Sequence, residues 1–202
     1  MIIININESM GIRFKGIIDK VLYDEFDGET IVCIIDYKTG NPNLNIKNVK
    51  YGLDMQLPVY IYLLKNLKEL KNVKVGGFYL QKVLNDKTTI EEKVNELKLQ
   101  GYSNSDINIL EKVDSTYNDS KMIRSMRTSS NGFYAYSKVI SDEEIEALAK
   151  EVENRVIEAS DKVINAKFDI NPKELNGKNI GCTYCKYKDI CYMTHKDIQK
   201  LD

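Results

Sequence analysis

Two aspartates and a lysine lie where two neighbouring β-strands are expected to end. The apolar run IVCII precedes Asp36, Lys38 follows two residues later, and Asp19 lies earlier in the run GIIDK. Between the two runs, Asp27-Gly28 is typical of a two-residue hairpin turn. Such a turn places residue 26 opposite residue 29, and the same register places Asp19 opposite Asp36. The sequence therefore predicts two carboxylates on directly opposed strand positions.

Side-chain alternation along a strand puts Lys38 on the same face as Asp36 and points Tyr37 away. Opposed like charges destabilise a sheet unless a cation compensates them. Carboxylate oxygens suit Mg²⁺ or Mn²⁺, which polarises a phosphate and lowers the pKa of an attacking water, while a lysine can orient that water or stabilise developing charge. The trio therefore favours metal-dependent phosphodiester hydrolysis.

Ordinary strand-end charges are the more common explanation of a D-x-K spacing taken alone. The position of Asp36 changes that balance, because it ends a run that is expected to be a buried strand. A carboxylate in such a place needs a partner or a metal ion.

The elements that must position these residues follow the order β, β, α, β. We predict strands over residues 12–23 and 30–38, a helix over 53–70, and a strand over 74–83 suited to the middle of a sheet. Pro58 is compatible with that helix only near its first turn or at a kink. Ser141 and Glu144 form a capping-box pattern that opens a further helix reaching about residue 166. In the poorly predicted stretch 85–136, only TTIEEKVNELKLQ favours a helix.

Composition fits one α/β domain over residues 1–202, with residues 177–193 as a cysteine-containing tail. The chain is 43% hydrophobic and has a formal net charge of −1, so any DNA contact must be local. Candidates for that contact are Lys121, Arg124 and Arg127, although a solvated face is the commoner explanation of such residues. No secretory signal or membrane-spanning stretch is visible, which favours a cytoplasmic protein without membrane contact.

At this point the motifs resemble the RecB-type branch of the PD-(D/E)xK nuclease superfamily. The likeness rests on GIIDK, IIDYKTG and LDMQLPVY, and covers roughly residues 12–84 and 137–193. It implies a restriction-endonuclease-like core, metal binding by Asp19, Asp36 and the backbone carbonyl of Tyr37, and catalysis by Lys38. It also implies that Gln56 and Tyr60, four residues apart on one helix face, complete the site and engage DNA. For Tyr60 alone, a half-buried core position is an equally good explanation.

The tail extends the resemblance to the AddB type of helicase-nuclease proteins and to CRISPR-associated exonucleases. Cys182, Cys185 and Cys191 form the pattern C-x2-C-x5-C, and in those families three such thiolates and an upstream cysteine hold a [4Fe-4S] cluster. That upstream cysteine has no counterpart here, and Cys33 is expected to be core. The set is therefore incomplete, and a zinc site with His195, a non-protein ligand or no metal are the alternatives.

The resemblance implies a DNA exonuclease acting on single-stranded ends during helicase-nuclease processing of double-strand breaks for recombinational repair. It also suggests that the chain is the C-terminal portion of a longer protein that works with a helicase-nuclease partner subunit. Alternatives are a non-catalytic DNA-binding or assembly module, a CRISPR-associated exonuclease-like protein, and a zinc-stabilised interaction domain. The last leaves the hairpin carboxylates unexplained.

Overall fold

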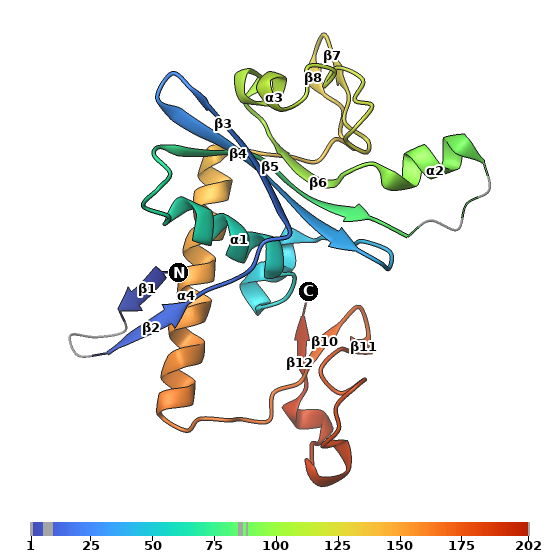
Figure 1. Cartoon of the computed structure of the whole chain (residues 1–202). Coiled ribbons are helices and arrows are strands. Elements are labelled where there is room, and N and C mark those ends of the chain that lie inside the picture. Colours follow the sequence, from blue (N-terminus) through green and yellow to red (C-terminus); the bar gives the residue numbers. More distant parts are fainter. Residues whose placement is uncertain (1, 6–9, 85–86, 88, 202) are drawn as a thin grey trace. The chain divides into compact units, whose positions relative to one another are not determined.

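The computed structural model describes residues 2–5, 10–84, 87 and 89–201. The chain divides into two compact units, Met1–Ile157 and Glu158–Asp202, while the expected single domain over 1–202 stays a prediction. Figure 1 shows the elements of both units, and their order and bounds are β1 (Ile2–Asn5), β2 (Gly11–Phe14), β3 (Lys20–Phe26), β4 (Glu29–Lys38), η1 (Ile46–Tyr51), α1 (Gln56–Lys65), β5 (Val73–Lys82), α2 (Ile90–Leu97), β6 (Gln100–Asn104), α3 (Ile107–Val113), β7 (Thr128–Ser129), β8 (Gly132–Phe133), β9 (Val139–Ile140), α4 (Asp142–Ile164), β10 (Lys173–Leu175), β11 (Lys178–Asn179), η2 (Lys188–Ile190), η3 (His195–Asp197) and β12 (Gln199–Leu201).

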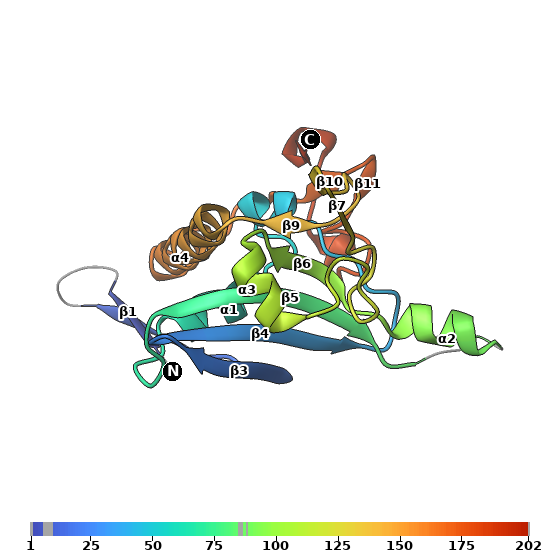
Figure 2. The same cartoon turned by 90° about the horizontal axis from the view of Figure 1, so that it is seen from above.

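A five-stranded mixed sheet in the order β3-β4-β5-β6-β9 forms the centre of the first unit. Figure 2 shows these strands following one another across the sheet. β4 pairs antiparallel with β3 and parallel with β5, and β5 pairs antiparallel with β6. The expected mixed sheet flanked by helices is confirmed, and the strand predicted over 74–83 is its middle strand, β5.

The β3–β4 hairpin has the predicted turn and register. Asp27 and Gly28 have φ angles of 51° and 80°, the left-handed conformations that a tight hairpin turn of this kind requires. Phe26 lies opposite Glu29 and Lys20 opposite Ile35, so Asp19 lies one residue before the paired strand. This register is the one expected from the Asp-Gly turn.

The single strand expected over 12–23 is wrong. The chain forms two strands there, because β2 pairs with β1 in a separate ribbon and β3 begins only at Lys20. Between them Gly16 passes so close to α1 that an added Cβ would lie 2.8 Å from the Leu63 side chain. The crossing from the ribbon to the sheet therefore interrupts the strand, and β1 itself was not anticipated.

The two faces of β4 and β5 pack against different layers. Val32 and Ile34 belong to a core shared with α1 and α4, whereas Ile35 and Tyr79 pack on the other face against α3 and the segment that contains Ile123. In Figure 1, α1 and α4 accordingly lie on one side of the sheet, and α3 on the other. Alternation along β4 thus decides which layer each side chain meets.

Helix α1 is shorter than the helix expected over 53–70. It begins at Gln56, because Gly52 and Asp54 adopt left-handed φ angles of 76° and 53° that no helix can include. It ends at Lys65, before the cap residue Asn66. Pro58 occupies the third helical position, within the first turn as expected. The consequence for the site is that Gln56 is the first residue of the helix.

The stretch 85–136, difficult to interpret from sequence, contains α2, β6, α3 and the small hairpin β7–β8. The helix favoured for TTIEEKVNELKLQ is present as α2, and the Thr89 hydroxyl accepts the backbone N–H of Glu92 at its start. Thr88 lies outside the described residues. Strands β6 and β9 and helix α3 were not predicted, because each is short and lacks strong periodicity.

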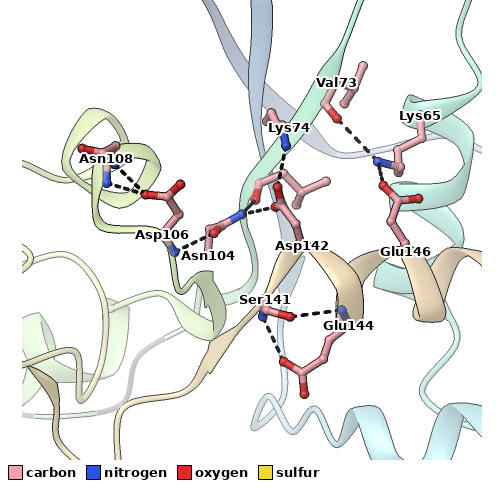
Figure 3. Close-up of polar contacts among 11 residues, drawn as sticks. Lys65, Val73, Lys74, Asn104, Asp106, Asn108, Ser141, Asp142, Glu144 and Glu146 are labelled. Atoms are coloured by element: carbon pink, nitrogen blue, oxygen red, sulfur yellow. Dashed lines mark hydrogen bonds and ion pairs between the residues drawn. The ribbon is translucent and has the colours of Figure 1, made fainter.

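Helix α4 begins with the predicted capping box. The Ser141 N–H donates to the Glu144 carboxylate at 2.9 Å, and the Glu144 N–H donates to the Ser141 hydroxyl at 3.3 Å. Figure 3 shows this cap beside a network in which the buried Asn104 donates to the Val75 carbonyl at 2.9 Å and to Asp142 at 2.7 Å. The ammonium of Lys74, on β5, pairs with the same Asp142 carboxylate at 2.6 Å. The network fixes the start of α4 to β5 and β6.

The Asp142 carboxylate titrates at lower pH than an ordinary aspartate. Burial raises its pKa, but the hydrogen bonds from Lys74 and Asn104 and the charges of Lys74 and Lys65 together lower it by more, so that the net pKa is lowered. A pKa below that of the unfolded chain stabilises the fold at neutral pH. This contribution is lost as the pH falls below about 4, where the carboxylate becomes protonated.

Replacing Asn104 by Ala is expected to lower the free energy of unfolding by about 1–3 kcal/mol, because the buried Val75 carbonyl loses a donor in its side-chain amide. Urea denaturation measures this loss. Asn108→Ala is the matched control, since its side chain is exposed and contacts only Asp106. Equal stability of the two variants would contradict the structural role given to Asn104.

Candidate active site

Asp36 is a buried carboxylate at the end of the central strand β4. It is 1% exposed. Its Oδ1 accepts a hydrogen bond from Gln56 Nε2 at 2.7 Å, and its Oδ2 lies 2.5 Å from Lys38 Nζ. The ion pair does not satisfy Oδ2 fully, because this atom receives no hydrogen bond from the described residues. Asp36 therefore has a partner for its charge and an oxygen still open to a further ligand.

Gln56 links the members of the site through both ends of its amide. Its Nε2 donates to Asp36 and, at 2.9 Å, to the hydroxyl of Tyr60, while its Oε1 accepts from Lys38 Nζ at 2.6 Å. Gln56 and Tyr60 are one helical turn apart on α1, which lets both reach the same point. Tyr60 is 8% exposed, so its ring is core and its hydroxyl belongs to the site.

Asp19 reaches β4 from the position just before β3. Its Oδ2 accepts the backbone N–H of Tyr37 at 3.0 Å, which ties the exposed Asp19 side chain to the strand between Asp36 and Lys38. Lys38 contacts Asp36 while the side chain of Tyr37 is 39% exposed, as the alternation predicted. The structure thus gathers all five residues expected at the site, and their catalytic roles stay a prediction.

The donor set fits a divalent cation. Asp36 Oδ2 is a buried oxygen without a hydrogen bond, and the bond from Tyr37 uses only one oxygen of Asp19. Two carboxylates are hard oxygen ligands, which Mg²⁺ and Mn²⁺ prefer. The Lys38 side chain is 34% exposed, so its ammonium can turn to water when a cation approaches Asp36. The carbonyl of Tyr37 stays a predicted third ligand.

The loop before α1 contains two positioning residues that the sequence reasoning missed. Asn48 is buried, and its Nδ2 donates to the Asp54 carboxylate at 2.7 Å. This bond holds the left-handed turn at Asp54, two residues before Gln56. The usable signal was a short polar side chain next to a helix start, where aspartate and asparagine form local hydrogen bonds.

The basic residues expected to contact DNA are not joined to this site by any contact among the described residues. Lys121 lies over the opposite face of the sheet, beside Ile35 and Cys33. Arg127 pairs with Asp119 at 3.7 Å and lies over the Tyr134 ring, whereas the backbone N–H of Arg124 donates to Leu99. DNA contact by Lys121, Arg124 and Arg127 stays a prediction.

The three tail cysteines are free thiols in the second unit. Cys185 is exposed, and Cys182 and Cys191 are partly buried. No group of three or more His, Cys, Asp or Glu side chains arranged to hold a metal ion occurs among the described residues. A [4Fe-4S] cluster or a zinc ion bound here with His195 therefore stays a prediction. Cys33 is a core residue whose burial raises its pKa to about 12.

The fold and the site residues define a class of protein. The sequence profile of the PD-(D/E)XK nuclease superfamily matches residues 2–192, and the chain belongs to this superfamily. In the described part of the chain, no helix has the length and apolar character needed to cross a membrane.

Similar curated proteins share one description, that of an AddB-type subunit of an ATP-dependent helicase/deoxyribonuclease. The protein from Natranaerobius thermophilus is 29% identical over 92% of this chain, that from Clostridium perfringens is 33% identical over 88%, and that from Alkaliphilus metalliredigens is 32% identical over 94%. The matches cover 17%, 17% and 18% of those proteins, so the chain spans about a sixth of their length.

Mn²⁺ at saturating concentration is expected to raise the melting temperature of the wild type, because a cation that binds only the folded state stabilises it, by about 2.7 kcal/mol at a hundred times its Kd. Asp36→Asn should lose most of this shift relative to its own metal-free melting temperature. Asp24→Asn, on the exposed part of β3, is the control and should keep it. An equal shift in all three proteins would place the cation elsewhere.

Proposed function

We propose that this domain is a Mg²⁺- or Mn²⁺-dependent deoxyribonuclease that hydrolyses phosphodiester bonds at the site of Asp19, Asp36 and Lys38. The observation that carries the proposal is the buried Asp36 carboxylate, which keeps one oxygen without a hydrogen bond while Lys38 and Gln56 contact the rest of the group. A structural ion pair has no need for such an open oxygen. Membership of the nuclease superfamily supports the same chemistry.

Each residue of the site has a distinct part in the proposed reaction. A cation held by Asp19 and Asp36 supplies Lewis acidity toward the phosphate and lowers the pKa of a bound water. Lys38 orients the attacking water or stabilises the charge that develops on the phosphate, because its ammonium is at the site and reaches solvent. Gln56 fixes the positions of Lys38 and Asp36 through its two amide ends.

Tyr60 and Gln56 are also the proposed DNA-contacting residues. Gln56 is exposed, and the Tyr60 hydroxyl accepts one of its amide hydrogens. Gln56 therefore lies at the surface of the site, where it can meet a phosphate, and Tyr60 positions it.

The proposed substrate is single-stranded DNA with a free end, and the proposed setting is the processing of double-strand breaks for recombinational repair. Similar proteins are described as helicase/deoxyribonuclease subunits, which supports DNA as substrate and a helicase partner for this domain. The near-neutral charge of the chain argues for binding through local groups, and such binding weakens as salt rises.

Purified protein should cut end-labelled single-stranded DNA in the presence of Mg²⁺ or Mn²⁺, and EDTA should stop it. Asp36→Ala and Lys38→Ala are each expected to reduce the rate at least about a hundredfold, because each removes a group that acts in the transition state. Asp24→Ala and Lys68→Ala, both at exposed positions, are the matched controls and should retain the rate.

Equal cleavage by the wild type and both site variants would identify a contaminating nuclease and refute the assignment. A wild type that binds Mn²⁺ but leaves DNA intact would contradict independent activity of this domain. A wild type that neither binds the metal nor cuts DNA would favour a non-catalytic module with the nuclease fold.

A further inference from the structure

The face of the sheet opposite Asp36 carries an open apolar groove. Its volume is about 640 Å³, and its floor is formed by β3, β4 and β5. The walls come from α2, the end of α3 and the segment around Ile123. Several apolar side chains that line it are strongly exposed, namely Leu22 (49%), Val94 (52%), Leu97 (40%) and Met122 (50%). An exposed apolar surface of this kind is typical of a binding site.

Helix α2 supplies a second, separate observation. Ile90, Val94 and Leu97 follow one another at helical spacing, yet none of the residues of α2 is buried. Ile90 is 82% exposed. An amphipathic helix normally covers its apolar stripe with another element. Because Val94 and Leu97 line the groove, a ligand that binds in the groove can also cover this stripe.

The charges around the groove are mainly positive, although the whole chain has a net charge of −1. One carboxylate, that of Asp24, faces it, together with the four lysines Lys20, Lys98, Lys112 and Lys121. Among the described residues none of these ammonium groups pairs with a carboxylate; Lys98 donates to the Ser120 carbonyl, and Lys112 lies over the Phe26 ring. The groove is therefore complementary to an apolar ligand that carries negative charge.

The lysines lie at both ends of the groove. Lys20 is opposite Ile35 in the sheet, whereas Lys112 lies 4.5 Å from the centre of the Phe26 ring, at the hairpin end. The six residue steps from 20 to 26 span roughly 20 Å of strand at about 3.3 Å each. A helix of about 13 residues has this length. A lipid-like anion has one charged end and would leave the lysines at the other end without a partner.

We propose that this groove binds an amphipathic helical segment of a partner protein, with an apolar stripe on the groove floor and acidic residues at both ends. The segment covers the α2 stripe, and its acidic ends meet Lys112 at the hairpin and Lys20, Lys98 and Lys121 at the other end. Asp36 lies on the other face of β4, so the binding does not use the catalytic residues. The proposal is independent of the nuclease activity.

Two labelled peptides of about 14 residues test it by fluorescence anisotropy. Both have leucines at helical spacing; one carries glutamates in its first and last turns, and the other lysines. The glutamate peptide is expected to bind the 202-residue protein at least about tenfold more tightly than the lysine peptide. Leu22→Asp should abolish binding, because it places a charge on the groove floor.

A charge reversal separates groove binding from general stickiness. The double variant Lys112→Glu and Lys121→Glu should weaken the glutamate peptide about five- to tenfold and strengthen the lysine peptide. Lys68→Glu, at an exposed position outside the groove, is the control and should change neither affinity. Circular dichroism melting checks that every variant is folded.

Three results would overturn the proposal. They are equal affinity for the two peptides, no binding of the glutamate peptide at about 1 mM, and binding that Leu22→Asp leaves unchanged. Displacement of the glutamate peptide by a single-stranded oligonucleotide would likewise overturn it and would make the groove a nucleic-acid site.

Discussion

The charge of Asp36 at the end of a buried strand is the constraint on which the site depends. A carboxylate that is 1% exposed is costly unless other groups compensate it. Lys38 supplies the opposite charge from the same strand, and Gln56 supplies a hydrogen bond from α1. The compensation is incomplete, because one oxygen receives no hydrogen bond from the described residues. This deficit is understandable if the group is kept for a cation and not for stability.

Several elements of the fold exist in the form that this carboxylate needs. β4 is paired on both sides, which fixes the direction of Asp36, and the left-handed turn at Asp54 starts α1 at the residue whose amide reaches the carboxylate. The alternation of β4 also separates two surfaces. Asp36 faces the layer of α1, whereas Cys33 and Ile35 face the groove, so that one strand serves two sites without sharing side chains.

The parts of the fold that were predictable from sequence are those with a strong local signal. The Asp-Gly turn gave the hairpin register, and through it the position of Asp19 beside β4; the capping box at Ser141 gave the start of α4. The bounds of α1 were wrong because left-handed residues before it carry no hydrophobic pattern. The interruption near Gly16 was missed because it depends on the tertiary contact with Leu63.

The site shows the same division between local and tertiary information. Side-chain alternation predicted that Lys38 and Asp36 share a face, and spacing predicted that Gln56 and Tyr60 share one. The double role of the Gln56 amide was beyond the sequence, because it follows from the approach of α1 to β4. The network of Asn104 and Asp142 was missed for the same reason, since its members are far apart in the chain.

The most direct measurement for the central claim is anomalous diffraction from a crystal of this domain grown with Mn²⁺. The account predicts one strong manganese peak within coordinating distance of Asp36 Oδ2 and of the Asp19 carboxylate, with Lys38 Nζ moved away from Asp36. An Asp36 carboxylate that keeps its ion pair with Lys38 at saturating Mn²⁺, with no peak beside it, would contradict the account.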